Sequence, residues 1–256
     1  MAEGWSQAEI STYTEMDNLH LVLAIVCCSM LIQSTFSFGG ALVALPLLAL
    51  VVDVKTATVL MTLLSCSIAA VVVARRWRDV EVRNAWRLIV SACAGIPLGI
   101  LFLGHVDGTV LKTVLACTVI VFTLVSLFKL KAIQLTHDNY AFVFGLISGI
   151  FGGAYNISGP PVVLYGSLVN WSPDRFRATI QSYALFTNAF AILGHCLAGN
   201  VTREVVTYYA WSLPILGVSV WLGSLVHRVI PGERYAVCVK VLLLILAARL
   251  LWSVAA

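Results

Sequence analysis

Long apolar stretches without charged residues occupy most of the chain. Six of them have about the ~20 residues that a helix needs to cross the hydrocarbon core of a bilayer; they cover residues 56–74, 88–104, 113–128, 178–202, 205–226 and, less cleanly, 235–255. Two others, 21–52 and 139–173, are too long for one straight crossing. About 32 helical residues extend roughly 48 Å, whereas the core is about 30 Å thick. The pattern predicts an all-α polytopic membrane protein.

Clusters of glycine and proline interrupt both long stretches, and such clusters break a helix rather than merely bend it. Each stretch is therefore a kinked crossing or a hairpin that returns to the face it entered. For the second stretch, a hairpin leaves eleven basic loop residues inside and three outside, whereas a crossing leaves eight and six. The positive-inside rule favours the hairpin. Loop charge does not decide between the two for the first stretch.

The two broken stretches begin two similar halves of the chain. Placing Pro46 over Pro160 also places Gly39 over Gly153. One hairpin plus three crossings is an odd number of crossings, so the second half is inverted relative to the first. We expect a tail over 1–18, a first repeat over 19–130, a cytoplasmic linker over 131–138 and an inverted repeat over 139–256, with both termini periplasmic. The tail has no basic start before its apolar run, which argues against a secretory signal.

Composition excludes several classes of protein. The chain is 60% apolar and 11% charged, whereas about a quarter of the residues of a soluble domain are charged. A cytosolic enzyme and a nucleic-acid binder are therefore excluded, and the net charge of +4 fits basic cytoplasmic loops. The seven cysteines lie in apolar stretches without metal-ligand spacing. We expect no metal and no cofactor.

The two helix breaks form the candidate binding site. Irregular backbone survives at mid-membrane only where protein buries it or where it lines an aqueous cavity, so we expect the two hairpin tips to meet near the bilayer centre. Hydroxyls, amides and helix-start N–H groups there suit an anion. The alternative is that the glycines only permit close helix packing. The predicted substrate-binding residues at the tips are Gln33, Ser34, Thr35, Ser37, Phe38, Gly39, Gly40, Gly153, Tyr155, Asn156, Ser158 and Gly159.

Polar residues on neighbouring helices extend this prediction. Asn188 shares a helix face with Gln181 and His195, and the face formed by Thr58, Thr62 and Ser65 is similar. These faces line a substrate path or form ordinary interhelical hydrogen bonds. Asn188 is included in the predicted substrate site. Arg249 is included as a counter-charge, with the alternative that it reaches outward to the interface.

Ion coupling is restricted by the absence of Asp and Glu from the predicted spans. A carboxylate proton relay is therefore not expected. The remaining alternatives are a coupling proton on His195, a sodium ion held by carbonyls and hydroxyls, or no coupling ion.

The residues at the two breaks resemble a known family. The segment from Gln33 to Gly40 with Pro46, and the segment Gly145-Leu146-Ile147-Ser148-Gly149-Ile150-Phe151-Gly152-Gly153 with Gly159-Pro160-Pro161, are similar to the paired signatures of the sulfite exporter TauE/SafE family. The resemblance covers nearly the whole chain. It implies a bacterial inner-membrane permease for a small anion such as sulfite, sulfoacetate or a related sulfonate. Phe38 stands where many members have glycine, which implies a tighter first tip.

Three functions remain as alternatives. The leading one is a transporter that holds a small anion between the tips and alternates access by rocking one repeat against the other. An anion channel with the same tips as its filter is the second. The third is an intramembrane serine hydrolase that uses Ser148 or Ser158 with His195 as base. We disfavour an enzyme, because it has no reason to duplicate the serine-glycine tip in inverted form.

Overall fold

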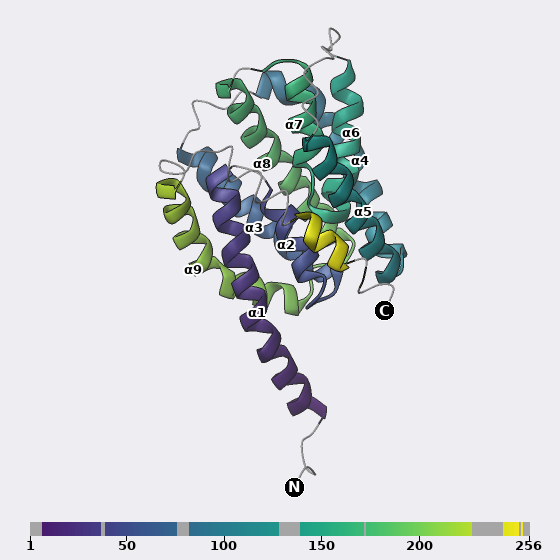
Figure 1. Ribbon diagram of the computed structural model, residues 1–256, viewed down its shortest axis with the longest axis vertical. Helices are drawn as coiled ribbons and strands as arrows, with labels where there is room; N and C mark the ends of the chain where they lie inside the picture. The colour runs from purple at the N-terminus through teal and green to yellow at the C-terminus, as the bar shows by residue number, and fades with distance from the viewer. Residues whose placement is uncertain are drawn as a thin grey trace.

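The computed structural model describes residues 7–36, 39–75, 82–127, 139–171, 173–226, 243–250 and 252. Every regular element in these ranges is a helix (Figure 1). The named helices are α1 (Gln7–Phe36), α2 (Gly40–Leu48), α3 (Val54–Arg75), α4 (Val82–His105), α5 (Gly108–Leu127), α6 (Tyr140–Tyr155), α7 (Gly159–Leu168), α8 (Pro173–Leu197) and α9 (Arg203–Val226). Residues 243–250 are also helical.

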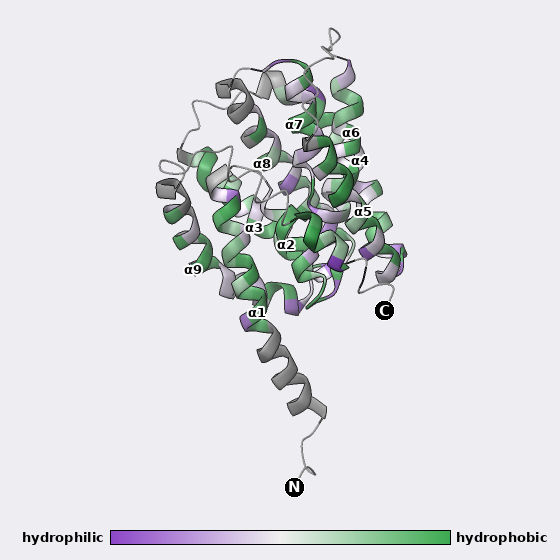
Figure 2. Ribbon diagram, viewed as in Figure 1, coloured by the Kyte–Doolittle hydropathy of each residue, from purple (hydrophilic) through white to green (hydrophobic). Residues whose placement is uncertain are grey.

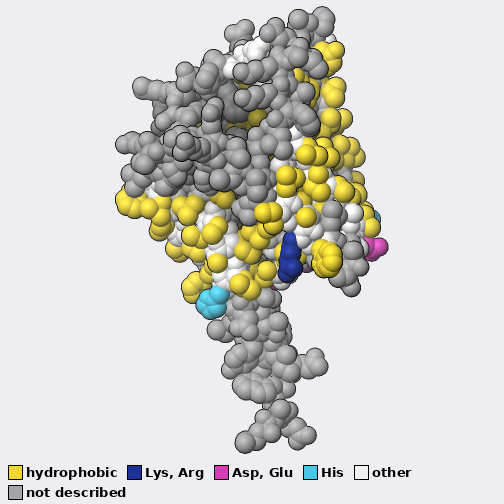
Figure 3. Space-filling model, viewed as in Figure 1, with side chains coloured by type: hydrophobic (Ala, Val, Ile, Leu, Met, Phe, Trp, Pro, Cys, Tyr) yellow, Lys and Arg dark blue, Asp and Glu magenta, His cyan; other side chains and the backbone are white. Residues whose placement is uncertain are grey.

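The helices are apolar along most of their length, as Figure 2 shows. Within the described ranges, Val54–Ala74, Ala85–His105 and Gly108–Val125 are each long and apolar enough to cross a membrane. Large apolar side chains also cover the outside: Leu101 is 55% exposed and Trp221 is 64% exposed. The described surface in Figure 3 is mainly hydrophobic. Such a surface is unfavourable in water but suits lipid, so the chain is a polytopic membrane protein, as predicted.

Both long apolar stretches are broken hairpins rather than continuous rods. α1 ends at Phe36 before α2 begins at Gly40, and α6 ends at Tyr155 before α7 begins at Gly159. The second arms, α2 and α7, have 9 and 10 residues, so each extends only about 15 Å, half of the hydrocarbon core. They pack back against α1 and α6. α1 is longer than predicted, because it begins at Gln7, inside the expected tail.

The helices next to the two breaks recur at one spacing along the chain, whereas α4 and α9 start 121 residues apart. The starts of α2 and α7 are 119 residues apart, and so are the starts of α3 and α8. This register places Pro46 over Tyr165, so the predicted alignment of Pro46 with Pro160 was wrong by five residues. The two prolines occupy different places in their helices. Pro160 lies in the first turn of α7, where its missing N–H is not needed, whereas Pro46 lies inside α2.

Helix packing follows the same correspondence between the two halves. α4 packs against α6 and α8, while its counterpart α9 packs against α1 and α3. α3 and α8, which correspond to each other, pack together. In Figure 1, α1 rises from the lower end of the molecule whereas α6 descends from the upper end. This is the arrangement expected of two inverted halves.

Glycines bring α4 and α6 into close contact. A Cβ on Gly149 would clash with the carbonyl oxygen of Ala92, and one on Gly153 would clash with that of Ile96. Gly99 of α4 faces the carbonyl of Ile150 in the same way. For this face of α6, the packing alternative is therefore correct, because small residues let two membrane helices approach closely.

Candidate functional site

The first hairpin tip is formed by the end of α1 and the start of α2. Gly39 precedes α2 with φ 91°, a left-handed conformation that favours glycine. Gly40 is buried beneath Gln33: a Cβ on Gly40 would lie 2.6 Å from the Gln33 Cβ and 2.8 Å from the Ser29 carbonyl oxygen. The Ser34 hydroxyl donates to the Ser219 carbonyl at 2.8 Å and so links α1 to α9. Three other predicted residues have side chains outside the described part of the chain: Thr35, Ser37 and Phe38.

The second tip is a capped helix end. Asn156 adopts the left-handed conformation with φ 52°, and its N–H donates to the Gly152 carbonyl at 2.9 Å. The Ile157 N–H donates to the Phe151 carbonyl at 3.2 Å. These bonds satisfy carbonyls at the end of α6 and leave the Asn156 side chain free to point elsewhere. Residues 156–158 separate the end of α6 from the start of α7.

The prediction of anion-binding N–H groups at both helix starts needs a correction at the second tip. α7 begins with Gly159, but Pro160 and Pro161 follow it in the first turn. Proline has no N–H, so two of the donors that a helix start normally offers are missing here. The first residues of α2 keep theirs, since no proline lies in its first turn.

The two tips meet at the hydroxyl of Ser65, which α3 places between them. Asn156 Nδ2 donates to Ser65 Oγ at 2.9 Å, and Gln33 Nε2 donates to the same oxygen at 3.4 Å. Ser65 is 5% exposed and Asn156 7% exposed. The buried Oε1 of Gln33 has no hydrogen-bond partner among the described residues. As predicted, polar groups from both hairpins thus converge at one buried point.

Another polar residue of α3 supports the second tip from the same side. Thr58 donates its hydroxyl to the carbonyl of Ala154 at 3.2 Å, which satisfies an acceptor in the last turn of α6. Thr62 donates to the Thr58 carbonyl within its own helix at 2.8 Å. The polar face of α3 therefore holds the α6 end in place, and it presents Ser65 to the two tips.

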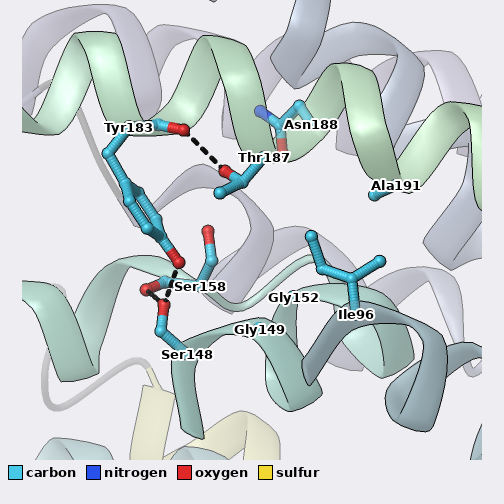
Figure 4. A pocket seen from close by; sticks show the side chains of 9 residues that line it. All are labelled: Ile96, Ser148, Gly149, Gly152, Ser158, Tyr183, Thr187, Asn188 and Ala191. Atoms are coloured by element: carbon cyan, nitrogen blue, oxygen red, sulfur yellow. Dashed lines mark hydrogen bonds between the residues drawn. The ribbon is translucent and has the colours of Figure 1, made fainter. Parts of the chain in front are cut away.

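A narrow gap lies on the other side of the second tip, between α4, α6, the α6–α7 break and α8 (Figure 4). It comprises about 180 Å³ outside protein atoms but nowhere has room for a water molecule. Ser148 donates to the Ser158 carbonyl, and its oxygen lies 2.6 Å from the Tyr183 hydroxyl. Because Ser148 has one proton, Tyr183 is the donor in the second bond. The gap is lined by Ile96, Ser148, Gly149, Gly152, Ser158, Tyr183, Thr187, Asn188 and Ala191.

Tyr155, Gly153 and Arg249, which were also predicted to bind substrate, belong to neither the Ser65 cluster nor the gap. Tyr155 is buried, and its hydroxyl donates to the Leu111 carbonyl at 3.0 Å, which anchors α6 to α5. Gly153 lies within α6 against α4, so its N–H belongs to the helix. Gly145, Gly149 and Gly153 recur every four residues, which indicates one packed helix face, a signal present in the sequence. Arg249 is exposed and is not among the residues that line the gap.

His195 also lies apart from both clusters. Asn200 Nδ2 lies 3.2 Å from its Nδ1, and its buried Nε2 has no partner among the described residues. The described part of the chain therefore contains no hydrogen-bonded pair of a serine with His195. This geometry disfavours the hydrolase alternative, which requires nucleophile and base within hydrogen-bond reach.

A second cavity is open at the surface. It has a volume of about 490 Å³ and lies between the α2–α3 connection and the start of α5. Asp53 and Lys112 contribute charges of opposite sign to its wall. The residues that form the Ser65 cluster do not line it.

These features define the class of protein: a membrane protein built on two broken hairpins of opposite direction that meet at a buried polar cluster, as in many secondary transporters. Residues 21–250 match the family described as Sulfite exporter TauE/SafE, and the chain belongs to this family. The resemblance inferred from the paired motifs is thus confirmed, and the family is one of transporters.

One curated relative is named "Probable sulfite/organosulfonate exporter TauE" and comes from Cupriavidus necator. It is 23% identical over 146 residues, a match that covers 54% of this chain and 57% of the relative. The match therefore spans little more than half of that protein. No solved structure matches this chain.

Proposed function

We propose that the protein is a bacterial inner-membrane carrier for a small sulfur-containing anion: sulfite, sulfoacetate or a related sulfonate. The anion binds between the two hairpin breaks. The observation that carries this proposal is the convergence of the Gln33 and Asn156 amides, one from each hairpin, on the single oxygen of Ser65. Two donors aimed at one acceptor form a pre-arranged site for an oxyanion oxygen, which would replace the Ser65 oxygen as the acceptor.

The donors of this site are neutral. Among the described residues that form the cluster, none carries a positive charge: Gln33, Ser65 and Asn156 are an amide, a hydroxyl and an amide. The start of α2, next to Gln33, adds N–H groups and the positive end of a helix dipole. Neutral donors bind an anion without holding it as strongly as a buried Arg, and a carrier must also release its substrate. Ser34, Gly39, Gly40, Ser158 and Gly159 complete the proposed tips.

Alternating access follows from the division of the site between the two halves. We assign Gln33 and Ser65 to the first repeat, 19–130, and Asn156 to the inverted second repeat, 139–256. Rocking of one repeat against the other separates the Gln33 and Asn156 donors and opens the cluster to one face. The burial of Ser65 and Asn156 supports a closed arrangement of this site.

The test uses two asparagines with the same backbone conformation. Asn156 and Asn170 both have positive φ, 52° and 53°, so glycine at either position fits the backbone. Only Asn156→Gly removes an amide that bonds to Ser65. In vesicles loaded with labelled sulfite or sulfoacetate, we expect Asn156→Gly to lose most of the flux, and Asn170→Gly to keep it.

Undiminished flux in Asn156→Gly would remove this residue from the site and overturn the proposal. The same assay separates a carrier from the channel alternative. A carrier gives saturable flux with turnover far below that of an open pore, whereas flux that rises in proportion to anion concentration would indicate a channel.

A further inference from the structure

The gap between α4, α6, the α6–α7 break and α8 differs chemically from the Ser65 cluster, although both touch the same helix break. Its polar lining consists of Ser148, Ser158, Tyr183, Thr187 and Asn188. All five offer oxygen atoms, and none is charged. Figure 4 shows Tyr183 reaching from α8 to Ser148 of α6 and Ser158 of the α6–α7 break, with Asn188 farther along α8.

Asn188 is the feature of this gap that the proposed anion site leaves unexplained. It is 6% exposed, it lines the gap, and no hydrogen bond joins its amide to another described residue. Buried side-chain amides are nearly always paired with protein or water, and the Asn188 amide has no protein partner among the described residues. The amide oxygen is thus available to a ligand.

The polarity of the break favours a cation on this side. α6 ends here, so the negative end of its dipole lies at the break. Pro160 and Pro161 remove two N–H donors from the start of α7. On the side that faces the gap, the second tip therefore presents oxygen acceptors and few N–H donors, whereas on its other side the Asn156 amide donates to Ser65. Broken helices of inverted-repeat transporters use such carbonyls and helix ends to hold a coupling cation.

The geometry points to a sodium site in this gap, formed by Ser148 Oγ, the Ser158 carbonyl, Thr187 Oγ1 and the Asn188 side-chain oxygen. Its role in transport rests on the proposed function: the ion balances the charge of the anion. Ser158 is two residues from Asn156, so a cation that orders the break also fixes the anion's donor. Binding of the two ions is then mutually favourable.

A proton does not fit this site as well as sodium does. Of the residues that line the gap, none carries a carboxylate or an imidazole. Its one weak acid is the phenol of Tyr183, and a phenol ordinarily ionises only near pH 10. Hard oxygen ligands without titrating groups suit an alkali or alkaline-earth cation.

The experiment measures the melting temperature of the full-length protein in lipid nanodiscs, without the anion, in NaCl, KCl or choline chloride of equal ionic strength. We expect NaCl alone to raise it in a saturable manner. Thr187 and Thr123 form a matched pair: each is 3% exposed and donates to the carbonyl four residues earlier, at 2.7 and 2.6 Å. Only Thr187 lines the gap.

We expect Thr187→Val to weaken sodium affinity by about tenfold or more, since loss of even an outer partner of a metal site lowers metal affinity by that factor. Thr123→Val should leave the sodium affinity unchanged. Asn188→Asp should strengthen sodium binding, because it adds a negative charge that the ion neutralises. No sodium-specific shift, or equal weakening in both valine variants, would overturn the inference.

Anion binding in choline chloride, measured separately, distinguishes the two proposals. Sulfite binding without a sodium effect removes only the cation site. A sodium effect without binding of any sulfur oxyanion removes only the proposed function.

Discussion

Ser65→Ala tests whether the Ser65 hydroxyl only occupies the anion's position in the anion-free protein or itself binds the anion. In the protein without anion, Ser65 Oγ accepts from the Asn156 and Gln33 amides. Alanine leaves these donors without their acceptor in a site where Asn156 is almost fully buried. A buried unsatisfied donor costs about 1–3 kcal/mol, so the free energy of unfolding should fall by that amount. Once an anion oxygen is bound, the same donors are satisfied and most of this loss is recovered.

Because the anion-free state is penalised more than the bound state, the apparent anion affinity should rise, by about tenfold for each 1.4 kcal/mol of the difference. Thermal unfolding with increasing sulfite measures both effects. Ser212→Ala is the control: Ser212 is buried and donates only within α9, to the Tyr208 carbonyl. If Ser65→Ala weakens or abolishes the rise in melting temperature that sulfite causes, Ser65 is itself a required ligand, and the anion does not simply replace its oxygen.

Two further predictions concern packing and protonation. Gly149→Ala places a methyl group against the Ala92 carbonyl and should lower the free energy of unfolding by about 1–3 kcal/mol. A methyl group added at Gly217 contacts no other atom, so Gly217→Ala should leave this free energy unchanged or raise it by up to about 1 kcal/mol. Equal effects of the two variants in thermal unfolding would contradict the close α4–α6 contact. His195→Ala should leave the pH profile of transport unchanged, because the ring bonds to Asn200 and lines neither cluster. A profile that loses a titration near neutral pH would identify His195 as a proton carrier instead.

Much of the fold was predictable because membrane helices are limited by length and by backbone satisfaction. Stretches of ~32 apolar residues cannot be straight crossings, and glycine at Gly39 and Gly159 marked both breaks within a residue or two. The register of the repeat was harder to predict. Proline fits the first turn of a helix and is also tolerated inside a membrane helix, so aligning Pro46 with Pro160 joined two positions that are not equivalent.

The site was predictable only in part. Gln33 and Asn156 were predicted as two of the polar residues beside the breaks, and Ser65 appeared only as one member of a polar stripe. Its position between the tips depends on how α3 packs, which a single sequence does not encode in any local pattern. The same holds for the contact of Ser148 with Tyr183, which joins α6 to α8. Gly153 was assigned to the site although its four-residue spacing with Gly149 indicated packing.

The most direct test of the central claim is to locate the anion by its anomalous scattering. Selenite, the selenium analogue of sulfite, would be soaked into crystals of the full-length protein. We expect a selenium peak between Gln33 and Asn156, with oxygen atoms within hydrogen-bond distance of both amides. A peak found instead in the surface cavity beside Lys112, with the Ser65 cluster unchanged, would contradict it.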